Sequence, residues 1–178
     1  MITIKQLTPE DATRIAEIDR TERVGVRYTY RDGQLRAETV DWDVPDFSRE
    51  GEGKYSLRHQ IDGVQRPLID SGGVLYGALD GDRVVGLAAL RYDLRPGMDQ
   101  LLYLMVSNGY RRQGIASRLV ARLFDIARER GARRMYVSAT PSESAVGFYL
   151  RKGFRPTEEP LPELLEEEPE DIHMIMEL

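Results

Sequence analysis

Alternation of apolar and polar positions marks short strands at the start of the chain, with a helical period between them. Residues 2–7 (ITIKQL) alternate as in a half-buried strand, and residues 8–20 follow with a Thr-Pro start and acids in the first turn, as an α-helix begins. Residues 24–42 carry β-branched and aromatic residues on both sides of Asp32-Gly33, a pair typical of tight hairpin turns. This part of the chain therefore predicts a strand, a helix and an inserted β-hairpin.

The pattern blurs between residues 43 and 73. Ile61, Val64 and Leu68 are spaced to line one face of a helix, but Gly63 and Pro67 count against it. The sequence assigns no element to this segment.

The remaining pattern is clearer. Residues 73–93 form two apolar runs around Asp80-Gly81-Asp82, which predicts a hairpin, and residues 100–106 (QLLYLMV) predict a third strand after it. A helix that ends at Gly131 is expected next, with Ile115, Leu119, Leu123 and Ile126 on one face. The elements expected after it are a strand at 133–140, a helix at 142–152, a solvated acidic loop at 162–171 and a last strand at 171–178. The chain thus predicts an α+β (α/β) fold with a mixed, mostly antiparallel central sheet flanked by helices.

Composition narrows the function. With 178 residues, 41% of them hydrophobic, and a formal charge of −5, the chain fits one compact cytoplasmic domain. The absence of cysteine excludes disulfides, thiolate zinc sites and a cysteine nucleophile. The two histidines, His59 and His173, are far apart in the sequence, which argues against a histidine-based metal site. The acidic balance argues against nucleic acid as a partner, and no segment resembles a signal peptide or a membrane span.

One helix start carries unusual chemistry. In residues 110–120 (YRRQGIASRLV) no Ser, Thr, Asp or Asn stands at the expected cap, while Arg111 and Arg112 precede Gly114 and Ala116. Free backbone N–H groups and the helix dipole favour an anion there, and small residues let a ligand approach the backbone. Neither G-x-G-x-x-G nor a P-loop motif is present. The sequence therefore predicts a site for the pyrophosphate of another kind of cofactor.

These residues resemble a known family. Residues 111–116 (RRQGIA) match the Q/R-x-x-G-x-G/A signature of the GNAT superfamily of acetyl-CoA-dependent N-acetyltransferases, and residues 142–154 (SESAVGFYLRKGF) are similar to its second cofactor segment. The order of elements agrees from Ile2 to Leu178 except in the stretch from Val24 to Gly73. The resemblance implies a GNAT-like acyl-CoA N-acyltransferase fold formed by residues 1–178 as a single domain.

The resemblance also implies roles for particular residues. The cofactor is acetyl-CoA, with no metal, and Tyr149 matches the tyrosine that protonates the leaving thiolate. Ser142 stands where many relatives have Asn, so its contact with the cofactor is an open expectation. Other residues implied to hold acetyl-CoA are Leu104, Met105 and Val106 along the pantetheine arm, with an amide near Met105 polarising the acetyl carbonyl, and Arg111, Arg112, Gln113, Gly114, Ile115, Ala116 and Ser117 at the pyrophosphate.

Acetyl transfer to an amine also needs a proton acceptor, because a lysine-like ammonium has a pKa of about 10.4. Asp99 is the first candidate and Glu143 the second. Asp41, Asp43 and Asp99 are candidates for attracting a cationic acceptor, either a small-molecule amine or a peptide.

Alternatives remain open at this point. Tyr149 has a second interpretation as a core aromatic, and Ser142 as a helix cap. The chain as a whole is also compatible with a non-catalytic acetyl-CoA-binding module, with transfer of a longer acyl group, or with an acyltransferase acting on a protein amino terminus. The sequence leaves the oligomeric state open between a monomer and a homodimer.

Overall fold

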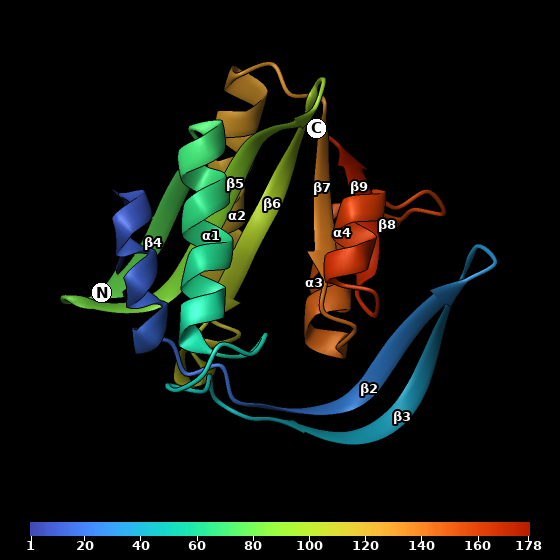
Figure 1. Ribbon diagram of the computed structural model, residues 1–178, viewed down its shortest axis with the longest axis horizontal. Coiled ribbons are helices and arrows are strands. Elements are labelled where there is room, and N and C mark those ends of the chain that lie inside the picture. The colour runs from blue at the N-terminus through green and yellow to red at the C-terminus, as the bar shows by residue number, and fades with distance from the viewer.

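A computed structural model describes all residues, 1–178 (Figure 1). A seven-stranded sheet has the strand order β1-β4-β5-β6-β7-β9-β8, and every neighbouring pair is antiparallel except β6 and β7. In that order the strands are β1 (Ile2–Leu7), β4 (Val74–Asp80), β5 (Arg83–Arg95), β6 (Met98–Val106), β7 (Arg134–Ala139), β9 (Ile172–Glu177) and β8 (Arg155–Pro156). The expected mixed, mostly antiparallel sheet is confirmed.

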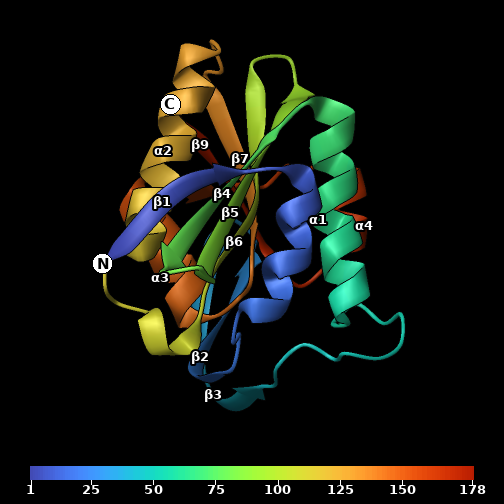
Figure 2. The same cartoon turned by 90° about the vertical axis from the view of Figure 1, so that its left-hand side faces the viewer.

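Helices cover both faces of this sheet (Figures 1 and 2). The 3-10 helix η1 (Pro9–Glu17) and helices α1 (Leu57–Ser71) and α4 (Pro162–Glu167) lie on the front face in Figure 1, and α2 (Ile115–Glu129) and α3 (Glu143–Lys152) lie behind. Of the apolar stripe expected for α2, Ile115, Leu119 and Leu123 are buried in the core of 23 residues on the back face, and Ile126 is partly buried against it. None of the helices combines the length and the apolar character that a membrane crossing needs.

The hairpin is present and longer than expected. β2 (Glu22–Arg31) and β3 (Gln34–Val44) form a separate two-stranded sheet, and the turn residues Asp32 and Gly33 both have positive φ angles, 52° and 70°. This is the backbone that the Asp-Gly pair favours in a two-residue hairpin. The hairpin passes below the main sheet in Figure 1. The amide of Tyr28 donates to the carbonyl of Pro141 (2.8 Å), which ties β2 to the segment between β7 and α3.

Three expectations change. Residues 8–20 contain a 3-10 helix rather than an α-helix, and the reason lies in the burial of Ala12, Ile15 and Ile18, whose spacing of three matches the 3-10 period. The acidic stretch expected as a loop contains α4, because Leu164 packs into a small cluster with Met98 and Tyr136.

The third change is in the unassigned segment, which contains α1. Val64 and Leu68 are buried on it, as their spacing indicated. Gly63 and Pro67 lie inside the helix. Tertiary packing of this apolar face against η1 and β5 outweighs the poor helix propensity of those two residues.

Candidate cofactor and acceptor site

The parallel strands β6 and β7 part from each other halfway along the sheet. They pair only where Met98–Gln100 faces Arg134–Tyr136, and their carboxyl-terminal halves diverge. Residues Leu102–Met105 are therefore only partly buried, although β6 is a central strand, whereas Leu87, Ala88 and Ala89 of the neighbouring β5 are fully buried. The open edge of β6 carries backbone groups without a strand partner on the β7 side, and it includes Leu104, Met105 and Val106 from the expected pantetheine site.

The loop after β6 ends in a set of free backbone donors. None of the N–H groups from Arg112 to Ser117 donates to another backbone group, and the first helical hydrogen bond of α2 runs from the Arg118 amide to the Gly114 carbonyl (3.0 Å). Gly114 is the N-cap, with φ 78° and no side-chain cap. The expectation of an uncapped helix start is confirmed, and its geometry suits an anion.

The two arginines of the motif have different surroundings. The Arg111 guanidinium points inward, where Nε donates to the Val106 carbonyl (3.0 Å) and Nη2 to the Arg20 carbonyl (3.1 Å), and it also faces Glu22 at 3.7 Å. The resemblance implied that Arg111 holds the pyrophosphate, but in the structure its guanidinium is engaged by the carbonyls of Val106 and Arg20. Arg112 is exposed, has a left-handed φ of 59° and forms no ion pair, so its charge is available at the loop.

Tyr149 lies on α3 and is 6% exposed. Its ring packs edge-on against Phe148 and Phe154, each with a centroid distance of 5.4 Å. Burial raises the pKa of the hydroxyl, and the charge of Asp171 raises it further. The hydroxyl is therefore protonated at neutral pH and can donate a proton, as a general acid must.

Ser142 and Glu143 have structural partners. Ser142 is the N-cap of α3, and its Oγ accepts from the Ala145 amide (3.3 Å). Glu143 accepts from the Gly25 amide of the hairpin (3.3 Å). A cofactor contact of Ser142 stays a prediction, and the cap interpretation is confirmed.

Asp99 is not brought together with these residues. It lies in the paired, closed half of β6, roughly 20 Å along the strand from Met105. Its Oδ1 accepts from the Asp93 amide (2.9 Å), it is 2% exposed, and burial raises its pKa. Of the other acids expected to attract an acceptor, Asp41 is paired with Arg23 (2.8 Å).

A carboxylate that the sequence did not single out lies at the open end instead. Asp171 immediately precedes Ile172, which pairs with Ala139, the last residue of β7. Asp171 lines a cavity of about 420 Å³ together with Tyr30 and Asp32 of the hairpin and with His173. Burial raises the pKa of Asp171 to about 7, the neighbouring Glu168 adds to this, and Lys54 opposes it. No local signal in the acidic run marks Asp171, because its place depends on the pairing of β9 with β7.

His173 holds the segment that carries Asp171. Its Nε2 lies 2.9 Å from the Glu168 carbonyl and its Nδ1 lies 2.8 Å from the Tyr136 hydroxyl. Nε2–H donating and Nδ1 accepting satisfies both contacts with a neutral ring, in agreement with the lowered pKa that burial gives this histidine. His173 therefore has a positioning role.

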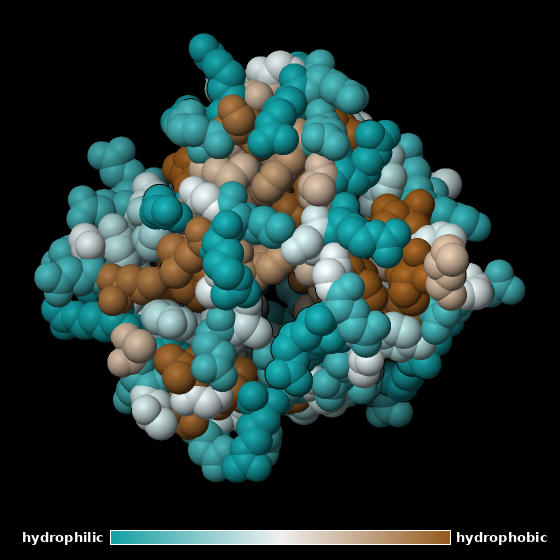
Figure 3. All heavy atoms as spheres, turned by 180° about the vertical axis from the view of Figure 1, so that it is seen from behind, coloured by the Kyte–Doolittle hydropathy of each residue, from teal (hydrophilic) through white to brown (hydrophobic).

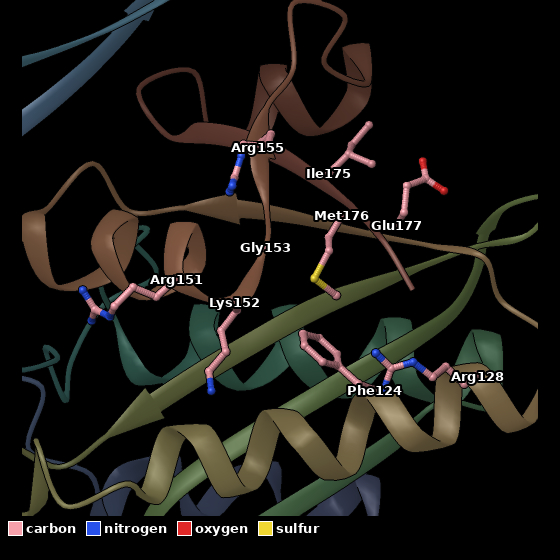
Figure 4. A pocket seen from close by; sticks show the side chains of 9 residues that line it. All are labelled: Phe124, Arg128, Arg151, Lys152, Gly153, Arg155, Ile175, Met176 and Glu177. Carbon is pink, nitrogen blue, oxygen red and sulfur yellow. The ribbon is translucent and has the colours of Figure 1, made fainter.

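The face formed by α2 and α3 is hollowed near its centre, where pale and brown side chains lie between rims of teal ones (Figure 3). A cavity of about 630 Å³ lies between the second half of α2, the end of α3 and β9 (Figure 4). The charged residues that line it are Arg128, Arg151, Lys152, Arg155 and Glu177. Figure 4 shows Lys152 pointing from α3 toward α2. The cavity lies nearly one helix length, roughly 20 Å, from Gly114, and four of its five charged lining residues are basic.

Fold and site together define a class of protein that can bind an extended, phosphorylated ligand between the diverging parallel strands β6 and β7, with the Tyr149 hydroxyl as the proton donor. Comparison with known proteins identifies the family: the model of the acetyltransferase (GNAT) family matches residues 36–154, and the chain belongs to that family. It is therefore an acetyltransferase by family, and the resemblance inferred from residues 111–116 and 142–154 is confirmed.

Individual relatives are more distant. N-alpha-acetyltransferase 30 of Schizosaccharomyces pombe is 35% identical over 81 residues, which are 43% of this chain and about half, 54%, of that protein. The crystal structure of nourseothricin acetyltransferase has a TM-score of 0.71 at 18% identity and covers 99% of this chain and 98% of that one. The structure of a putative streptothricin acetyltransferase from Bacillus anthracis, in complex with acetyl coenzyme A, has a TM-score of 0.71 at 16% identity, with 100% and 99% covered. These two structures are similar in fold along their whole length.

Proposed function

We propose that this protein transfers an acetyl group from acetyl-CoA directly to the primary amine of a small cationic acceptor. The observation that carries the proposal is the run of free backbone N–H groups from Arg112 to Ser117 beside the open edge of β6. The amides and the Arg112 charge would hold the pyrophosphate, and the β6 edge at Leu104–Val106 would pair with the pantetheine arm. Acetyl coenzyme A bound to the B. anthracis structural relative supports this choice of cofactor.

Tyr149 would deliver the proton that the leaving thiolate needs. It comes from α3, which follows β7, and its hydroxyl carries its proton at neutral pH. A backbone N–H of β6 near Met105 would stabilise the oxyanion of the tetrahedral intermediate. The amine attacks the thioester carbon, the C–S bond breaks, and the sulfur leaves as a thiol. The chain needs no covalent intermediate for this step.

The acceptor region favours a small molecule over a protein amino terminus. The segment 168–171 is tied to the hairpin by the pair of Arg27 with Glu170 (2.9 Å) and to the loop before α1 by the pair of Lys54 with Glu168. These contacts hold the hairpin and the loop before α1 against the segment next to Asp171. The names of the two structural relatives, a nourseothricin acetyltransferase and a putative streptothricin acetyltransferase, support a small-molecule acceptor.

A turnover screen tests the proposal. Release of CoA thiol from acetyl-CoA is measured with small polyamines, streptothricin-like and aminoglycoside-like amines, and peptides with free amino termini. Thiol release with at least one small cationic amine is expected. Cofactor binding without thiol release for any amine would favour a binding module, and turnover confined to peptides would contradict the small acceptor.

Tyr149→Phe tests the acid. The ring and its packing against Phe148 and Phe154 are kept while one hydroxyl is lost, so we expect kcat to fall about 100-fold with acetyl-CoA affinity almost unchanged. Phe148→Tyr in the same helix is the matched control, because it adds a hydroxyl without removing the acid. Unaltered kcat in Tyr149→Phe would assign Tyr149 to the core alone.

A further inference from the structure

Asp171 is the one carboxylate of its segment without a cation. Glu168 pairs with Lys54 and Glu170 pairs with Arg27 (2.9 Å), whereas the Asp171 side chain forms no ion pair and no hydrogen bond within the chain. Three carboxylates against two cations leave one negative charge. That charge faces the cavity of about 420 Å³ beneath the hairpin tip.

The position of Asp171 is fixed relative to the reacting groups. The register of β9 with β7 places it one residue beyond Ala139, at the open end of the β6–β7 divergence. Its charge raises the pKa of the Tyr149 hydroxyl. His173 and Glu168 hold its backbone, through the contact of Nε2 with the Glu168 carbonyl and a hydrogen bond from the Asp171 amide to the same carbonyl (3.3 Å).

From this geometry we infer that Asp171 accepts the proton of the acceptor's ammonium and that the adjoining cavity holds the acceptor's cationic part. The inference rests on the proposed acetyl transfer and adds to it the missing proton acceptor, a role that the closed-end Asp99 is too distant to fill. Without a substrate, the Asp171 carboxylate forms no ion pair with the chain. With a cationic amine bound, each charge of the segment has a partner.

The proton balance is complete. The ammonium gives one proton to the Asp171 carboxylate, and the freed lone pair forms the C–N bond at the thioester carbon. When the C–S bond breaks, the sulfur takes a proton from Tyr149, and the second proton lost by the nitrogen restores the tyrosine through solvent. Asp171 then releases its proton to water. The products are the amide, CoA thiol and one proton.

The surroundings adjust Asp171 for this task. Burial and the nearby charges of Glu168 and Glu170 raise its pKa to about 7, and Lys54 opposes them. The neutral His173 and the protonated Tyr149 carry no charge at this pH. The cavity wall also carries Arg31, Asp32 and Glu158, and Arg27 is paired with Glu170. A base with a pKa near the working pH is the most effective acceptor of this proton.

The test compares pH profiles of kcat/KM for wild type and Asp171→Asn with the best cationic amine of the screen. Wild type should lose activity below an apparent pKa near 7 and follow the amine's own ionisation above it. Asp171→Asn should lose the limb near 7 and keep the amine limb. Its kcat should fall below that of wild type by up to about 100-fold. Asp171→Glu should keep the limb near 7 and much of the rate. The stabilisation of each variant by acetyl-CoA shows that it is folded.

Glu170→Gln is the matched control, since it removes the same charge from the same segment. It should keep both limbs, with the lower one moved slightly toward acid because one negative neighbour of Asp171 is gone. A limb near 7 that persists in Asp171→Asn, or a kcat within threefold of wild type, overturns the role of Asp171 and leaves the acetyltransferase proposal intact. Wild type that releases no thiol with any amine refutes the proposed function itself, and the inference with it.

Discussion

The uncapped start of α2 offers the most direct test of cofactor binding, through Gly114→Glu. The Gly114 φ of 78° is a left-handed conformation, so any other residue there costs about 1–2 kcal/mol of folding free energy. A Cβ built at this position meets no atom within 4 Å. The mutant carboxylate would lie among the free N–H groups of Arg112 to Ser117, and its attraction to the helix start offsets about 0.3–1 kcal/mol of the strain. The variant should therefore fold.

The expected size of the ligand effect follows from mass action. Acetyl-CoA at 100 times its Kd stabilises the folded state by about 2.7 kcal/mol. For a chain of this length each kcal/mol raises Tm by about 2–4 °C, so wild type should gain about 5–11 °C. Gly114→Glu should gain almost nothing, because its carboxylate takes the place of the pyrophosphate. The assay is thermal unfolding followed by fluorescence, with and without acetyl-CoA.

Gly114→Ala separates strain from charge. It has the same backbone cost and a small Cβ but no carboxylate, so it should lose stability like Gly114→Glu and still gain most of the ligand shift. Equal shifts for Gly114→Glu and wild type would refute the phosphate site at this loop. Loss of the shift in both variants would instead assign the requirement to the glycine backbone and not to the anion.

Two further predictions concern single side chains. Arg111→Ala should lower the free energy of unfolding by about 2–3 kcal/mol, because it loses charged hydrogen bonds to two carbonyls. Arg112→Ala should leave Tm unchanged and weaken acetyl-CoA binding. Calorimetry with both variants measures this, and the reverse pattern would contradict it. Asp171→Asn should be more stable than wild type at pH 8 but not at pH 4. The pKa of Asp171 is about 7 in the folded state and about 3.9 in the unfolded state, so between these two pH values the folded state binds more protons. Wild type therefore loses stability as the pH rises from about 4 to 7. Denaturant unfolding at both pH values measures it.

Local sequence signals account for most of the fold. The strands of the main sheet alternate or form apolar runs, and the hairpin turn is encoded by Asp32-Gly33 itself. The sequence was less informative where packing outweighs propensity. In α1, burial of Val64 and Leu68 holds a helix around Gly63 and Pro67, and in α4 the burial of Leu164 converts an acidic run into a helix turn.

The candidate site divides in the same way. The free N–H groups after β6 were predictable because helix capping depends on a few adjacent residues, and here the cap is a glycine. The direction of the Arg111 side chain was not, because the Arg20 carbonyl that accepts its hydrogen bond lies far away in the sequence. Backbone chemistry is thus encoded locally, whereas the use of a long side chain depends on partners that only the folded chain supplies.

The two carboxylates considered as proton acceptors show how far this dependence reaches. Asp99 lies in β6 and Asp171 immediately precedes β9, and burial raises the pKa of both. They differ in which end of the β6–β7 pair they occupy. At the closed end, Asp99 has one oxygen bonded to the Asp93 amide and the other enclosed, so no substrate can reach it. At the open end, Asp171 lines a cavity under the hairpin tip, and its charge raises the pKa of the Tyr149 hydroxyl. Strand register therefore decides which acid can act on a ligand, and here register is set by pairing residues that lie 33 to 43 positions apart in the sequence.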